Sequence, residues 1–206
     1  MKRYLLIGFF FVGAITMLVM SLHFFQNEIS GILKYKDVSS NFLYRLCFKT
    51  HIFLGIVAIF TGPTQFLTKW RASYLKVHRR LGYVYFLSVL ISAVMGLLVA
   101  QFAMGGMVSM LGFSVLGVFW FSSAVLAIAA VRKKDIVAHK KWMFISYGLT
   151  FAAITQRTLL LVPLLTSIEF IFIYRLSAWL PWILNTTIAL YLFKKSNLKE
   201  MTYREG

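Results

Sequence analysis

Hydrophobic residues fall in long uninterrupted blocks, and this pattern constrains the fold more than any other feature of the sequence. A block of about 20 apolar residues crosses the hydrocarbon core of a bilayer as one α-helix. Backbone polar groups in lipid must be satisfied internally, and apolar runs without period-two alternation indicate helices rather than barrel strands. The sequence therefore predicts an all-α integral membrane protein, a six-helix bundle. The six predicted spans are roughly Leu5–Phe25, Leu43–Leu67, Leu81–Met104, Met107–Val131, Trp142–Leu165 and Phe172–Phe193.

The spans leave almost no sequence for a soluble domain. Of the 206 residues, 60% are hydrophobic and 14% are charged, whereas a soluble domain has about 45–50% apolar and about 25% charged residues. We therefore predict a single transmembrane domain over residues 1–206. The first block is too long for the apolar region of a signal peptide, and no small-x-small cleavage site follows it. It is predicted to stay as a membrane anchor.

Basic residues alternate between successive loops along the chain. The N-terminus, the Thr68–Arg80 loop, the Arg132–Lys141 loop and the C-terminus carry most of the Lys and Arg residues, and the Gly105-Gly106 turn carries none. The positive-inside rule then places both termini in the cytoplasm. A net charge of +16 would suggest a nucleic-acid partner in a soluble protein. Here the topology explains the charge, so the predicted partner is the lipid bilayer and not nucleic acid.

Two of the four histidines occupy equivalent places. Val77-His78-Arg79-Arg80-Leu81 resembles Ala138-His139-Lys140-Lys141-Trp142, and each segment begins a span at the cytoplasmic face. A haem b with two axial histidines needs one imidazole from each of two neighbouring helices at equal depth. His78 and His139 are therefore candidate metal ligands. The alternative is a pair of interfacial histidines that face lipid head groups or loop carbonyls.

Small residues could supply the space that a porphyrin needs. Gly82 follows His78 by four residues, and Gly55 and Gly62 share a face with His51. The basic residues beside His78 and His139 disfavour the imidazolium form and could hold haem propionates. Gln65 is predicted to join His78 and His139 in this inner cluster. Against a haem, small residues in membrane helices more often serve close helix packing.

Arg157 lies deep in the fifth span, next to Gln156. A charge in lipid costs at least about 2.5–3.5 kcal/mol, so the side chain should face the bundle or a cavity. Arg157 follows His139 by 18 residues, or five helical turns, which places it on the same face roughly 27 Å away. We expect an outer cluster of His51, Gln156 and Arg157 that binds a cofactor or substrate. A purely structural Arg157, satisfied by backbone carbonyls, is the alternative.

Carboxylates are scarce, and this scarcity disfavours one class of function. The chain has six Asp and Glu residues, none within the core of a predicted span. Proton pumps and cation-coupled transporters normally use an intramembrane carboxylate. No phosphate-binding loop, nucleophile motif or acidic metal site accompanies the spans.

The order of these motifs is similar to that of a known family. The sequence contains His51-x-x-x-Gly55, Gly62-Pro63-x-Gln65-Phe66, a segment from His78 to Tyr85, His139-Lys140-Lys141-Trp142-Met143 and Gln156-Arg157. Over roughly residues 45–165 this string resembles the uncharacterised bacterial membrane family DUF2306. The resemblance implies a protein of about six helices in the bacterial inner membrane, with no activity attached.

A looser, fold-level similarity is to transmembrane b-type cytochromes. It implies a redox protein, either a membrane oxidoreductase or an electron-transfer subunit. Such a protein would hold haem b and exchange electrons with a quinone or another redox partner. A second haem would require His23 to pair with His51. The alternatives are a small-solute or anion carrier that uses Arg157, and a colourless scaffold or accessory subunit.

Overall fold

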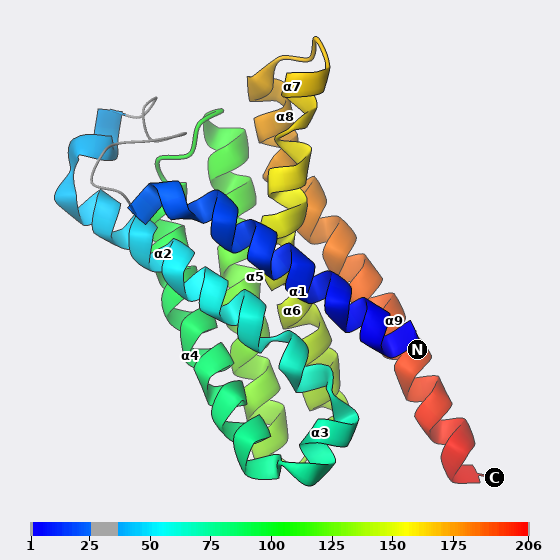
Figure 1. The fold of residues 1–206 in the computed structure, drawn as a ribbon. Coiled ribbons are helices and arrows are strands. Elements are labelled where there is room, and N and C mark those ends of the chain that lie inside the picture. Colours follow the sequence, from blue (N-terminus) through cyan, green and yellow to red (C-terminus); the bar gives the residue numbers. More distant parts are fainter. Residues whose placement is uncertain (1, 26–36, 206) are drawn as a thin grey trace.

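The computed structural model describes residues 2–25 and 37–205, and these residues form helices joined by short turns (Figure 1). Five helical stretches within them are long and apolar enough to cross a membrane. The main helices are α1 (Lys2–Ser21), α2 (Phe42–Thr61), α4 (Leu75–Ala100), α5 (Met107–Arg132), α6 (Ile136–Leu159), α8 (Phe170–Ser177) and α9 (Leu180–Glu205). Short elements connect them: η1 (Leu22–Phe25), η3 (Asp37–Ser40), η4 (Pro63–Phe66), α3 (Thr68–Ser73) and α7 (Val162–Leu165).

Helices α2, α4, α5 and α6 form the central bundle. Consecutive helices pack side by side, α2 on α4, α4 on α5, and α5 on α6. The core residues that meet between them combine small side chains with a few large aromatic ones, as close packing of membrane helices requires. They are Ala58, Tyr85, Val89, Ala93, Trp120, Ala124, Ile145, Tyr147 and Leu149.

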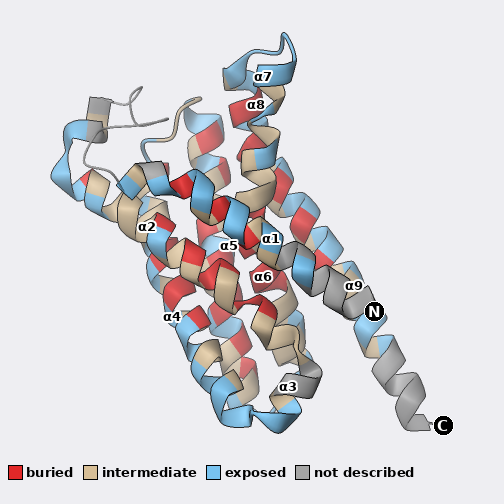
Figure 2. Cartoon of the chain, viewed as in Figure 1, coloured by how far each residue is buried: buried red, intermediate tan, exposed pale blue. Residues whose placement is uncertain are grey.

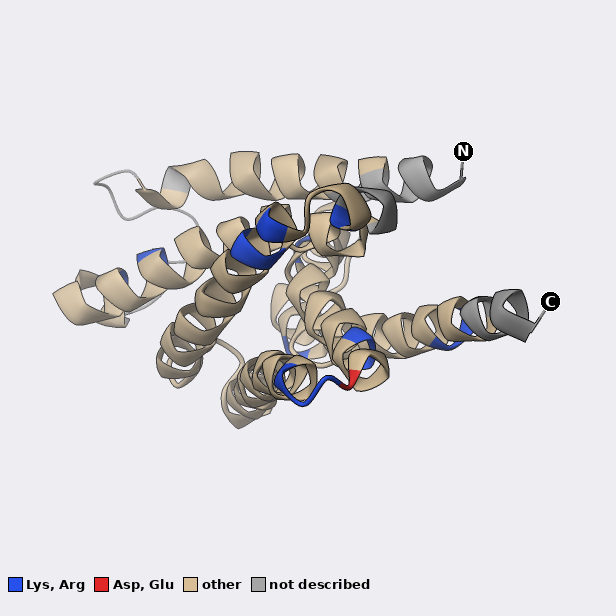
Figure 3. Cartoon of the chain, turned by 90° about the horizontal axis from the view of Figure 1, so that it is seen from below, with Lys and Arg blue, Asp and Glu red and all other residues tan. Residues whose placement is uncertain are grey.

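Two helices cover this bundle from outside. Helix α9 packs along α6, while α1 crosses α2 and α6 on one face (Figures 1 and 3). Gly13 on α1 makes the crossing close, because a Cβ there would lie 3.0 Å from Cδ1 of Ile154. The described part of α1 contains a shorter apolar stretch, Phe11–Ser21. Five predicted spans thus correspond to helices of membrane-spanning length, and the sixth, α1, stays a prediction.

Two helices begin more than a turn before the predicted spans, both at basic loops. The third span was expected to begin at Leu81, but α4 begins at Leu75, and α6 begins at Ile136 rather than Trp142. Helix α6 starts there because the Asp135 carboxylate accepts a hydrogen bond from the Ala138 amide (2.9 Å), which caps the helix. Basic side chains extend from the first turns toward water, so the helices continue past the apolar region.

Two prolines stand where a predicted span is interrupted. Helix α2 ends at Thr61, and Pro63 begins the 3₁₀ turn η4. The last predicted span is divided into α8 and α9, with Pro181 in the first turn of α9. Proline cannot donate a backbone hydrogen bond, so it is tolerated at the start of a helix. Gly105 and Gly106 have φ values of 84° and 71°, which allow the tight turn between α4 and α5.

The basic loops gather at one end of the bundle, called the basic end below. The α3–α4 and α5–α6 connections and the C-terminal end of α9 lie there (Figures 1 and 3). The Gly105-Gly106 turn and α7 lie at the other end, the opposite end. This concentration of basic loops at one end of the bundle agrees with the positive-inside rule. The cytoplasmic placement of both termini remains a prediction, and Gln26–Lys36 of the first predicted loop lie outside the described residues.

Large apolar side chains cover the outside of the bundle. Leu164 and Leu165 are 78% and 83% exposed, and many similar residues are exposed along α4, α5 and α9. Figure 2 shows buried positions on the inward sides of the helices and exposed positions facing out. A soluble monomer rarely exposes contiguous apolar surface on this scale. The surface therefore fits a lipid environment.

Candidate functional site

His78 and His139 occupy the same position in their helices. Each is the fourth residue of its helix, α4 or α6, at the basic end. Both side chains are half-buried, while Arg79, Arg80 and Lys141 next to them are exposed. The two imidazoles lie close enough to interact electrostatically. The repeated local sequence thus brings two histidines together between α4 and α6.

A backbone hydrogen bond fixes the ring of His139. Its Nδ1 lies 2.8 Å from the carbonyl oxygen of Ala127 on α5. A carbonyl can only accept, so Nδ1 carries the proton and Nε2 of the neutral ring keeps its lone pair. His78 differs, because its Nδ1 is buried without a hydrogen-bond partner among the described residues. Buried polar atoms are rarely left unpaired, and each exception needs an explanation.

Gln65 lies in η4 and approaches α4 near His78. Its Oε1 lies 3.2 Å from where a Cβ on Gly82 would stand, and Gly82 is one turn along α4 from His78. The expectation that glycines leave open space for a porphyrin was wrong. Gln65 covers Gly82, the Ser92 hydroxyl lies over Gly55, and the Tyr147 ring lies against Gly62. Of these, the amide of Gln65 ends a flexible side chain that can move.

His51 lies in the middle of α2 and packs against α4 and α5. Its Nδ1 is 2.8 Å from the Ser92 carbonyl oxygen, and the Ser92 hydroxyl donates to the His51 carbonyl oxygen at 2.8 Å. The Trp120 ring meets the imidazole edge-on, with centroids 6.4 Å apart. These contacts hold the half-buried imidazole of His51 against α4 and α5. The proposed pairing of His51 with His23 cannot be followed, because the His23 side chain lies outside the described residues.

Arg157 faces the contact between α6 and α1. Its Nη1 donates a hydrogen bond to the carbonyl oxygen of Ala153 in its own helix at 3.1 Å. The guanidinium also lies close enough to His51 to interact with it electrostatically. It lines a cleft of about 80 Å³, called the Arg157 cleft, whose other lining residues are Thr16, Met17, Met20, Ile154, Thr158 and Leu161. Gln156, also half-buried, is not among them.

A hydrogen-bonded group in the core was not foreseen from the sequence. The Tyr85 hydroxyl lies 2.8 Å from the Ser146 hydroxyl and 3.0 Å from the Thr150 hydroxyl. The Trp120 indole donates to Thr150 at 2.8 Å. Serines and threonines inside apolar helices were the available indication, because buried hydroxyls need partners. This core network joins α4, α5 and α6 between the histidine pair and His51.

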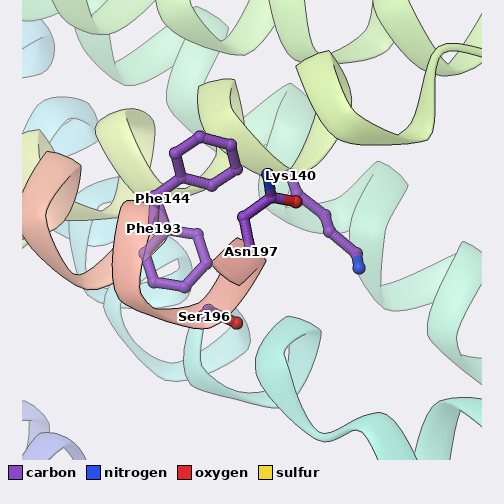
Figure 4. A pocket seen from close by; sticks show the side chains of 5 residues that line it. All are labelled: Lys140, Phe144, Phe193, Ser196 and Asn197. Atoms are coloured by element: carbon purple, nitrogen blue, oxygen red, sulfur yellow. The ribbon is translucent and has the colours of Figure 1, made fainter. Parts of the chain in front are cut away.

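A second, shallower hollow lies between α6 and α9 at the basic end. Lys140, Phe144, Phe193, Ser196 and Asn197 line it (Figure 4). Its volume of about 10 Å³ is near the minimum for a single water molecule. Residues 2–25 and 37–205 hold no group of three or more His, Cys, Asp or Glu side chains that could bind a metal ion. The histidine pair and the Arg157 cleft are therefore the two candidate sites.

The apolar helices and their lipid-facing surface define a multi-pass α-helical membrane protein. A family model for predicted membrane proteins, DUF2306, matches residues 48–193. The chain belongs to this family. The match includes His78, His139 and Arg157 but not α1, which forms one wall of the Arg157 cleft. No curated protein and no solved structure matches the chain.

Proposed function

We propose that the protein is a membrane redox protein that holds one haem b between His78 and His139. The observation that carries the proposal is the presence of two half-buried imidazoles, each the fourth residue of its helix, at the basic end of α4 and α6. A structural zinc site takes four protein ligands. A porphyrin supplies the equatorial ligands itself and needs only axial ligands from the protein, so two histidines suit haem better than a bare ion.

The hydrogen bonding of the two rings supports this role. Metal-binding histidines usually donate their second ring N–H to a carbonyl or carboxylate, which fixes the tautomer. His139 makes this contact with the Ala127 carbonyl, and its Nε2 remains available. The unpartnered Nδ1 of His78 is a polar atom that the surrounding protein leaves unsatisfied. If His78 held the haem iron through Nδ1, this atom would have a partner.

The surroundings suit the rest of the cofactor. Arg79, Arg80, Lys140 and Lys141 follow the two histidines directly, and their cations would pair with propionates at the basic end. The Gln65 amide, which covers Gly82, is the group that must turn away to admit the ring. Iron held by two histidines exchanges electrons without binding a substrate. The protein side chains would bind and orient the haem and screen it from water.

We propose a membrane quinone as the electron-exchange partner, in the cytoplasmic membrane of a bacterium. Support comes from the small amount of chain outside the apolar helices, because a lipid-soluble carrier reaches such a protein from within the bilayer. The test is reoxidation of the dithionite-reduced protein by a soluble quinone analogue. A reduced spectrum that persists with the quinone and disappears only with oxygen would exclude this partner.

The haem itself is tested by a reduced-minus-oxidised spectrum of the protein purified in detergent. We expect a b-type spectrum with one haem per chain, lost in His78→Ala and in His139→Ala. His51→Gln is the matched control, because His51 is a half-buried histidine in the middle of α2, away from the basic end, and it should keep the spectrum. Purified protein without haem, when expressed with added haem precursor, would overturn the proposal. A carrier or a scaffold would be colourless.

A further inference from the structure

Arg157 carries a positive charge that its protein neighbours satisfy only in part. Within the described residues, the guanidinium makes one hydrogen bond, to the Ala153 carbonyl at 3.1 Å. Arginine has five N–H donors and stays protonated in proteins. None of the residues that line its cleft is a carboxylate. The remaining donors therefore face a space that holds no matching acceptor from the protein.

The walls of the Arg157 cleft are apolar and come from α1 and α6. Thr16, Met17 and Met20 share one face of α1 with Gly13, where the two helices meet closely. Met17 is buried at the floor of the cleft, whereas Thr16, Met20, Thr158 and Leu161 are exposed at its rim. The cleft therefore opens sideways to the lipid-facing surface. A ligand would enter from the bilayer rather than along the bundle axis.

The chemistry of the cleft selects the kind of ligand. An unneutralised charge in a low-dielectric site is best matched by an opposite charge that forms hydrogen bonds. The guanidinium fork fits a carboxylate or a phosphate with two parallel hydrogen bonds. Flexible methionines beside it suit an alkyl chain of variable shape. The cleft volume of about 80 Å³ leaves room for the head group of the ligand. Its alkyl chain must therefore lie along the lipid-facing rim.

We propose that the Arg157 cleft binds the anionic head group, a carboxylate or a phosphate, of a membrane amphiphile whose alkyl chain lies against α1. The Thr16 hydroxyl at the rim can add a hydrogen bond to the same head group, whereas the Thr158 hydroxyl already donates to the Ile154 carbonyl oxygen at 3.1 Å. This site does not depend on the haem. It lies near the far end of α6 from His139, so its occupancy and the haem spectrum can be measured separately.

The test compares three amphiphiles with single chains and different head groups. Oleate offers a carboxylate, oleoyl lysophosphatidate a phosphate, and oleyl alcohol a neutral hydroxyl. Binding of each to the purified, delipidated protein is followed by native mass spectrometry. We expect one saturable equivalent of an anionic amphiphile, bound at least about tenfold more tightly than oleyl alcohol, since a charge-assisted hydrogen bond exceeds a neutral one by this factor.

Three variants separate the charge from the cleft and from general electrostatics. Arg157→Gln removes the charge and should weaken anionic binding at least about tenfold. Thr16→Phe fills the rim, keeps Arg157, and should also weaken binding. Arg132→Gln, which removes an exposed cation at the basic end, should change nothing. Size-exclusion profiles establish that each variant is folded, so that a loss of binding refers to the site.

The outcomes decide the proposal and the source of the anion. Preference for oleate identifies a fatty-acid carboxylate, and preference for the lysophosphatidate identifies a phospholipid head group. Equal affinity for all three compounds, or full binding by Arg157→Gln, would overturn the proposal. Displacement of the bound compound by inorganic phosphate alone would also overturn it, because the cleft would then recognise a free anion. A purified protein that shows no haem spectrum but still binds the anionic amphiphile would contradict the proposed haem and support the Arg157 cleft as a separate site.

Discussion

The histidine pair and the Arg157 cleft place polar groups in the membrane in different ways. At the basic end, His78 and His139 stand next to loops rich in cations, and one ring is held by a backbone carbonyl. At the other site, a single cation lies against methionine and leucine with one backbone acceptor. The first arrangement fixes one imidazole by a backbone hydrogen bond and leaves Nδ1 of the other without a partner among the described residues. The second leaves a charge in need of a partner. Polar residues with similar burial can thus require different ligands.

Trp120→Ala should have the largest effect on stability, because the indole is part of the core between the two sites. Its ring packs edge-on against His51 and its Nε1 donates to Thr150. Truncation of a large buried aromatic side chain costs about 3–5 kcal/mol. Reversible unfolding in mixed micelles with increasing SDS measures this loss. If the variant lost the haem spectrum with unchanged stability, Trp120 would belong to the histidine site rather than to the shared core.

Tyr85→Phe should cost less, although its hydroxyl is fully enclosed. The change removes the contacts to Ser146 and Thr150, but the Thr150 hydroxyl still donates to the Ser146 carbonyl oxygen and accepts from the Trp120 indole. We expect a loss of about 1 kcal/mol in the free energy of unfolding. The same SDS titration measures it. A loss of haem together with unaltered unfolding would contradict a purely structural role for this hydroxyl.

Asn185→Leu should have a smaller effect still. The Asn185 amide donates to the Thr155 hydroxyl at 3.0 Å and joins α9 to α6. Hydrogen bonds between membrane helices contribute about 0.6 kcal/mol on average. Because the bond lies away from both candidate sites, the haem spectrum and the binding of amphiphiles should be unchanged. A change in either property would show that α9 influences that site.

Arg157→Leu should not lower stability and should separate the two sites most clearly. A charged residue in the membrane is costly, and this one makes a single hydrogen bond within its own helix. The free energy of unfolding should stay the same or rise, and the haem spectrum should be unchanged. A large loss of stability would instead identify Arg157 as a structural residue. Arg157 would then serve stability rather than ligand binding, and the contrast between the histidine pair and the Arg157 cleft would no longer hold.

The sequence predicted the histidine pair because its indication is local. The same five-residue pattern begins two helices, and His78 and His139 hold the same position in each of them. The lengths of the spans likewise follow from apolar runs, apart from the basic first turns of α4 and α6. Charged residues in the first turn of a helix favour the prediction of a loop. Their long side chains can nevertheless reach water from within the helix.

The wall of the Arg157 cleft and the core network could not be predicted in the same way. Both depend on which helices become neighbours. Nothing local in Thr16 or Met17 indicates that α1 crosses α6, and the partners of Tyr85 lie 61 and 65 residues away along the chain. The glycines illustrate the same point. Gly62 was predicted to leave space beside a histidine, whereas it accommodates the Tyr147 ring.

Chemical rescue tests the central claim, that His78 and His139 both bind one haem, more directly than any other measurement. His78→Gly removes the imidazole and leaves a space of the same shape. We predict that this variant loses the b-type spectrum and that added imidazole restores it in a saturable way. His51→Gly should keep its spectrum without imidazole. A His78→Gly protein that retains the full spectrum, or that imidazole fails to restore while it remains folded, would contradict the assignment.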